Sequence, residues 1–94
     1  MSVKIKITPV ALSDLQKGID YYNLQQNGLG ARFEEVINAT FEKIASMPLS
    51  ASYAFDNVRY KVAKDFPYII LYEVEVAYIQ ILRVYNTHLS AEDI

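Results

Sequence analysis

Arg59 and Lys61 stand two residues apart in an alternating stretch, and Arg83 and Tyr85 repeat that spacing near the C-terminus. Residues two apart on a β-strand leave the same face, so each pair should present its side chains together. Arg offers a forked donor pair to phosphate, and Tyr or His can stack on a base. If the two strands are neighbours, these side chains and His88 could converge on a phosphate-bearing ligand. The alternative is a basic sheet face that is only solvated.

His88 is the only histidine, and it could act as a general acid or base near neutral pH. The alternative is a tail residue without a chemical role. The absence of cysteine excludes disulfides, thiolate nucleophiles and zinc–thiolate sites. Neither a Gly-rich phosphate loop nor a nucleophile elbow occurs, so we expect no cofactor and no metal.

Tyr21 and Tyr22 are adjacent in a stretch with helical periodicity. Consecutive helical residues diverge by about 100°, so one of the two rings must face away from the core. An exposed Tyr21 would be a suitable anchor for a protein partner. The alternative is a ring that lies across the edge of a helical hairpin.

The length and charge of the chain limit the classes of function. Its 94 residues suffice for one domain, residues 1–94. The formal net charge of −2 argues against broad, non-specific nucleic-acid binding. The strongly apolar run 68–72 is too short to span a membrane, and residues 1–8 lack an apolar signal core. We expect a cytoplasmic protein.

The N-terminal half of the sequence begins with alternating apolar and polar residues and continues with helical periodicity. Residues 3–7 alternate apolar and Lys side chains, which predicts a strand. Thr8 is a candidate N-cap before Pro9, and a helix is expected over residues 10–26. Gly18 inside it suggests close packing, because Gly costs about 1 kcal/mol relative to Ala in a helix. The predicted apolar stripe of this helix is Leu12, Leu15, Ile19 and Tyr22.

A second helix is expected from residue 29 or 31 to residue 47, where Pro48 ends it. Asn27 and Gly28 favour a tight reversal, so the two helices should form an antiparallel hairpin. The predicted apolar stripe of the second helix is Phe33, Val36, Ile37, Thr40, Phe41 and Ile44.

The C-terminal half is rich in β-branched and aromatic residues. Strands are predicted over residues 58–62, 68–74 and 78–85, with a short hairpin turn at 75–77. Residues 49–57 are interpreted as a loop, and 86–94 as a polar, loosely ordered tail. The fold class is therefore α+β in the order β-α-α-β-β-β, with a helical hairpin packed on an antiparallel-rich sheet.

The strand sequences VRYKV at 58–62, KDFPYIILYEVE at 64–75 and IQILRVYNTH at 79–88 resemble the RelE/ParE superfamily of toxins from type II toxin–antitoxin systems. The N-terminal half agrees, with ALSDL at 11–15, IDYY at 19–22 and GLGARF at 28–33. The details are closest to the ParE branch, the plasmid-stabilisation proteins. The Phe-Pro-Tyr step at 66–68 is among the most specific pieces, and Phe66, Tyr68 and Tyr21 are the candidate partner-binding residues.

The resemblance implies a toxin that a cognate antitoxin neutralises. ParE-like members are associated with poisoning DNA gyrase through protein–protein contact. RelE-like members cleave mRNA on the ribosome, which here would require Arg59, Lys61 and Arg83 around a phosphate and Tyr85 or His88 for proton transfer. A third alternative is a non-toxic member that serves as an interaction domain. Edge-strand pairing could also make a homodimer when the antitoxin is missing.

Overall fold

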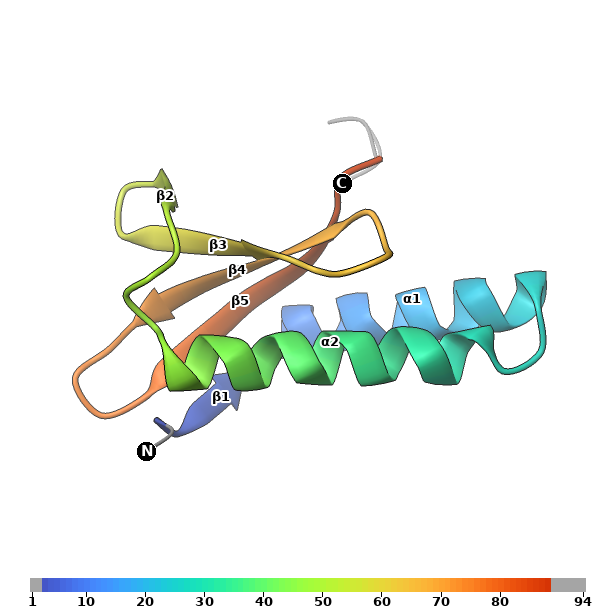
Figure 1. The fold of residues 1–94 in the computed structure, drawn as a ribbon, viewed down its shortest axis with the longest axis horizontal. Coiled ribbons are helices and arrows are strands. Elements are labelled where there is room, and N and C mark those ends of the chain that lie inside the picture. The colour runs from blue at the N-terminus through green and yellow to red at the C-terminus, as the bar shows by residue number, and fades with distance from the viewer. Residues whose placement is uncertain (1–2, 89–94) are drawn as a thin grey trace.

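A computed structural model describes residues 3–88 of the chain (Figure 1). Two helices, α1 (Pro9–Gln25) and α2 (Leu29–Ser46), form a hairpin beside a five-stranded sheet. The strands are β1 (Ile5–Ile7), β2 (Tyr53–Phe55), β3 (Val58–Val62), β4 (Tyr68–Val74) and β5 (Ile79–Asn86). The predicted α+β class and the helical hairpin are confirmed.

The sheet has the strand order β1-β5-β4-β3-β2. The pairs β2–β3, β3–β4 and β4–β5 are antiparallel, and β1 pairs with β5 in parallel. The sheet is therefore antiparallel-rich, as predicted. Because β1 pairs only with residues 79–81, the second half of β5 has no strand on its outer side within the described residues.

The strand β2 lies in the segment that the sequence predicted to be a loop, so that prediction was wrong. Tyr53 pairs with Arg59 and Phe55 with Val58, across a turn in which Asp56 has a φ of 44°. All three residues of β2 are exposed. A short edge strand with no buried side has no alternation of apolar and polar residues, which is the signal that strand prediction uses.

The first helix begins as predicted. Thr8 is its N-cap, and the Thr8 hydroxyl oxygen accepts a hydrogen bond from the Ala11 amide at 3.1 Å. The predicted stripe was partly wrong, because Leu12 is 53% exposed. The stripe that packs on the core lies one residue earlier at its start. Its buried members are Ala11, Leu15, Gly18 and Tyr22.

The two helices approach each other closely at Gly18. A β-carbon on Gly18 would lie 2.5 Å from Cε2 of Phe33 on α2, a distance that real contacts do not reach. The close packing expected at this glycine is thus confirmed. The reversal between the helices uses Gly28, whose φ of 86° favours glycine.

Aromatic rings fill the space between the hairpin and the sheet. The Phe33 ring centroid lies 4.7 Å from that of Tyr68 and 5.2 Å from that of Phe66. Tyr22 completes the cluster, at 5.1 Å from Phe33 and 4.9 Å from Phe66. Both aromatic residues of the Phe-Pro-Tyr step therefore pack under α1 and α2, and they fix the start of β4.

Candidate functional site

The basic residues of β3 and β5 lie on opposite faces of the sheet. Arg59 pairs with Tyr72 of β4, whose side chain is buried on the helix side. Arg83 pairs with Leu71, the neighbouring residue of β4. Paired residues share a face and successive residues alternate, so Arg59 and Arg83 project in opposite directions.

The expected convergence on one phosphate does not occur. The strand β4 separates β3 from β5. Lys61 follows Arg59 on its face, and Tyr85 follows Arg83 on the other. The sequence prediction required the strands of Arg59 and Arg83 to be neighbours. The spacing of residues within each strand does not determine which strands are adjacent in the sheet.

Arg59 is used to hold the segment that leads into β2. Its Nη1 donates hydrogen bonds to the carbonyl oxygens of Ala51, at 2.6 Å, and Leu49, at 3.3 Å. Its Nη2 donates to the Tyr53 hydroxyl at 2.8 Å, and the guanidinium lies 4.1 Å from the Tyr53 ring centroid. These contacts use three of the five N–H donors of Arg59 and hold its guanidinium against Tyr53 and the segment before β2.

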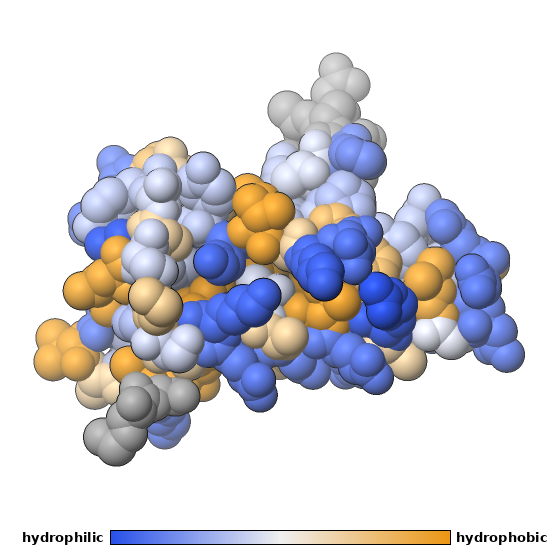
Figure 2. Space-filling model, viewed as in Figure 1, coloured by the Kyte–Doolittle hydropathy of each residue, from blue (hydrophilic) through white to orange (hydrophobic). Residues whose placement is uncertain are grey.

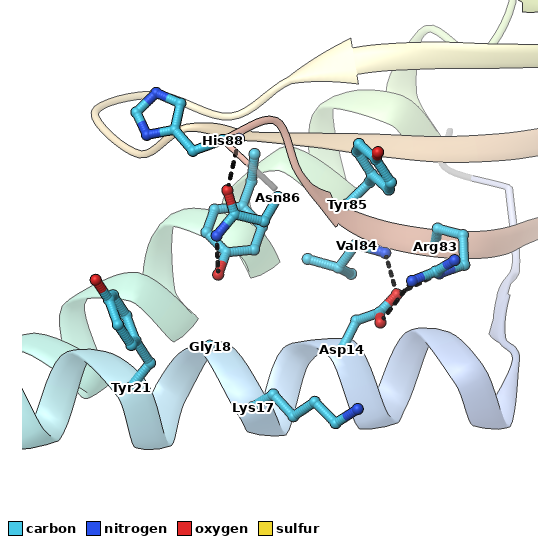
Figure 3. Close-up of a pocket in the computed structure, with 10 residues that line it drawn as sticks. Asp14, Lys17, Gly18, Tyr21, Arg83, Val84, Tyr85, Asn86 and His88 are labelled. Atoms are coloured by element: carbon cyan, nitrogen blue, oxygen red, sulfur yellow. Dashed lines mark hydrogen bonds and ion pairs between the residues drawn. The ribbon is translucent and has the colours of Figure 1, made fainter. Parts of the chain in front are cut away.

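Arg83 is engaged by Asp14 of α1 (Figure 3). Its Nε lies 2.7 Å from Oδ2 of Asp14, and its Nη2 lies 3.0 Å from Oδ1, so the pair is bidentate. The hydrogen bond to Asp14 raises the pKa of Arg83, an effect opposed by burial. Asp14 also accepts a hydrogen bond from the Val84 amide at 3.1 Å.

Two side chains near the start of the hairpin thus supply hydrogen-bond partners to the outer edge of β5, beyond the end of β1. The Thr8 hydroxyl donates to the Leu82 carbonyl at 3.1 Å, and Asp14 accepts from Val84. Both backbone groups would otherwise lack partners at an uncovered edge. The hairpin is therefore tied to β5 by polar contacts as well as by the core.

A hollow of about 460 Å³ opens beside this ion pair, between α1 and the end of β5 (Figure 3). We call it the β5 hollow. Five of the residues singled out from the sequence line it, although no single motif grouped them: Tyr21, Tyr68, Arg83, Tyr85 and His88. The other three lie elsewhere, with Arg59 and Lys61 on β3 and Phe66 in the aromatic cluster.

Sequence reasoning missed four polar or small residues of the β5 hollow, which are Asp14, Lys17, Gly18 and Asn86. Asp14 and Lys17 carried no signal beyond that of a polar helix face. Gly18 was noticed only as a packing residue. Asn86 was assigned to the tail at 86–94, whereas it is the last residue of β5. Residues 89–94 of that predicted tail lie outside the described residues.

A chain of hydrogen bonds orders the mouth of the β5 hollow. The His88 amide donates to Oδ1 of Asn86 at 2.8 Å, and Nδ2 of Asn86 donates to the Tyr68 hydroxyl oxygen at 3.3 Å. Burial raises the pKa of Tyr68, so its hydroxyl keeps its proton at neutral pH. Opposite these groups, Tyr21 is 53% exposed, and its ring meets that of Tyr22 edge-on at 5.1 Å. As predicted, only Tyr21 of this pair faces outward.

A second surface is apolar and lies at the other end of the sheet. Hydrophobic side chains, mixed with polar ones, lie at the end that carries the β4–β5 turn (Figure 2). We call this surface the apolar end, and the exposed hydrophobic residues of the segments that meet there are Met47, Leu49, Tyr53, Phe55, Val74 and Val76. Leu49, Tyr53 and Val74 line one hollow, which Arg59 and Glu73 also line. Exposed apolar side chains gathered in this way are typical of protein–protein interfaces.

In the part of the chain that the structure describes, His, Asp and Glu side chains nowhere gather in threes that could hold a metal ion. Neither α1 nor α2 combines the length and the apolar character that crossing a membrane requires.

Comparisons with known proteins identify a structure with the same fold and a matching family. A solved structure described as the chromosomal ParDE TA system from P. aeruginosa superposes with a TM-score of 0.83 at 19% sequence identity, covering 93% of this chain and 98% of that chain. Among curated proteins, none matches the sequence. Residues 5–88 match the sequence model described as ParE toxin of type II toxin-antitoxin system, parDE. The chain therefore belongs to the ParE toxin family.

Proposed function

We propose that this ParE-family chain acts in the cytoplasm by binding DNA gyrase, and that a cognate antitoxin holds it inactive. The family match over residues 5–88 is the observation that carries this proposal. The matched family and the similar structure both belong to toxin–antitoxin systems, which supports an antitoxin partner.

The placement of the cations favours a binding toxin over an mRNA endonuclease. The nuclease mechanism would need Arg59, Lys61 and Arg83 around one scissile phosphate. Arg59 and Lys61 instead project from the face opposite Arg83, and both arginines are already engaged within the chain. Individual roles for Tyr85 and His88 in proton transfer remain sequence predictions.

The two surfaces suit two partners. The β5 hollow adjoins the part of β5 that has no outer strand among the described residues, so an antitoxin segment could add to this edge and fill the hollow. The apolar end is distant along the sheet, and we assign it to the gyrase contact. Exposed aromatic side chains such as Tyr53 and Phe55 are suitable anchors for such a contact.

The test is a supercoiling assay with purified DNA gyrase and the purified full chain. The chain should inhibit supercoiling, and Phe55→Lys should weaken the inhibition by placing a charge in the apolar end. Leu24→Lys is the matched control, since Leu24 is 89% exposed on α1, outside the apolar end. Unchanged supercoiling at any concentration of the native chain would exclude gyrase as the target.

A parallel assay separates the alternatives. Ribosomes programmed with a defined mRNA should leave that mRNA intact in the presence of the chain. Cleavage would instead establish the endonuclease function. Sedimentation of the isolated chain tests the further prediction of a homodimer through an edge strand.

A further inference from the structure

The Tyr68 hydroxyl has a proton to donate into the β5 hollow. Because the His88 amide is a donor, the Asn86 side-chain atom that receives it must be Oδ1. Nδ2 of Asn86 therefore faces Tyr68 and donates to its oxygen. Within residues 3–88, no hydrogen bond uses the Tyr68 proton. The Tyr68 residue is only 5% exposed, so its direction is fixed by packing.

Gly18 keeps access to this hydroxyl open. A β-carbon at position 18 would lie 3.3 Å from the Tyr68 hydroxyl oxygen. Any longer side chain there would stand between α1 and the hydroxyl, in the space that now forms part of the hollow. The Tyr68 hydroxyl thus lies at the floor of the β5 hollow, and it is accessible because Gly18 has no side chain.

The charge around this donor favours a single negative group. Asp14 and Arg83 neutralise each other, and Nε and Nη2 of Arg83 are engaged in that pair. Lys17 lines the same hollow and has no ion pair among the described residues. The net charge that these three side chains give the hollow is therefore +1, beside the donors of Tyr68 and Asn86.

We propose that the β5 hollow binds one carboxylate side chain, an Asp or Glu of the antitoxin, with the Tyr68 hydroxyl as its main donor and Lys17 as its counter-charge. This inference rests on the proposed antitoxin partner and assigns the chemistry by which that partner is recognised. Tyr21, exposed at the mouth, then packs on the apolar part of the same partner segment.

A phosphate group of a nucleic acid fits the hollow less well. Phosphate recognition favours an arginine fork, and the only arginine that lines the hollow already donates from Nε and Nη2 to Asp14. The chain's net charge of −2 adds to this preference.

The test is a double-mutant cycle on the complex of the full chain with the antitoxin that restores growth when co-expressed. Tyr68→Phe keeps the ring and removes the donor. It should raise the dissociation constant roughly tenfold or more. Exactly one Asp→Asn or Glu→Gln change in the antitoxin should weaken binding similarly, and should have little further effect in the Tyr68→Phe background.

Tyr60→Phe is the matched control, because Tyr60 is half-buried on β3 and does not line the hollow. It should change the affinity by less than about twofold. If Tyr68→Phe binds as the native chain does, or if no antitoxin carboxylate is coupled to it, the proposal is overturned while the toxin–antitoxin pairing stands.

A second measurement does not depend on the antitoxin. Acetate, added to the full chain at constant ionic strength, should produce saturable NMR shifts at the Asn86 side-chain amide, and Tyr68→Phe should abolish them. Acetamide, the neutral analogue, should produce none. Equal shifts from both molecules would refute carboxylate recognition, and tighter binding of a short RNA than of acetate in the same hollow would assign it to nucleic acid.

Discussion

At the residue scale, the contacts of Asp14 explain how the hairpin and the sheet are joined. One carboxylate receives two donors from Arg83 and one from the Val84 amide. Its side chain is 13% exposed, against 33% for Arg83. Removal of the negative charge would leave a half-buried guanidinium without its counter-ion, which costs more than the loss of an exposed pair.

Asp14→Asn should therefore lower the free energy of unfolding by about 1–2 kcal/mol, because the amide keeps one acceptor but loses the charge. Urea unfolding followed by circular dichroism measures the change. Arg32→Gln is the control. It removes the pair of Arg32 with Asp65, whose side chains are 58% and 46% exposed, and should cost less than about 0.5 kcal/mol. Equal losses in the two variants would contradict the role given to Asp14.

At the scale of elements, the hairpin and the three long strands were predictable because their apolar periods are strong. Thr8 and Pro9 marked the start of α1, and the stripe of α2 from Phe33 to Ile44 is buried except for the half-buried Val36. The strand β2 was not predictable, because all its side chains are exposed and its partner β3 supplies the pairing.

The composition of the β5 hollow could be predicted only in part. Tyr21, Arg83 and His88 stood out by residue type, since aromatic and basic side chains suit binding. Asp14 did not, because its role arises from the early end of β1, which leaves the Val84 amide uncovered. That relation depends on tertiary register, and the spacing of residues within one helix does not contain it.

At the scale of elements, the close approach of α1 to α2 leads to a prediction for Gly18. Gly18→Ala should destabilise the fold by about 1–3 kcal/mol, because its methyl group would collide with the buried Phe33 ring. Helix propensity alone predicts the opposite sign, a gain of about 1 kcal/mol. Ser13→Ala, at an exposed position of the same helix, should give a small gain. A stabilised Gly18→Ala protein in chemical denaturation would show that the helices can move apart without cost.

At the scale of the whole molecule, three buried tyrosines couple stability to alkaline pH. Burial is the main cause that raises the pKa values of Tyr22, Tyr68 and Tyr72 above the ordinary 10.0. Below that value both folded and unfolded chains keep these protons, so the contribution to stability is complete. Above it the unfolded chain loses protons first, and stability falls as pH rises toward the folded-state pKa values.

The free energy of unfolding should consequently decrease from about pH 9 to about pH 11, measured by urea titration at each pH. Phenolate absorbance should appear together with unfolding for these three rings. Tyr68→Phe removes one of them and should give a shallower pH dependence. A free energy of unfolding that is constant over this range would contradict their burial.

The central claim is that the chain arrests growth by protein binding. Induced expression of the chain alone in a bacterium, with DNA damage signalling and translation followed separately, tests it most directly. Growth arrest with an SOS response and filamentation is expected, while mRNA stays intact and protein synthesis continues at first. Rapid loss of translation with cleaved mRNA, and no SOS response, would contradict it.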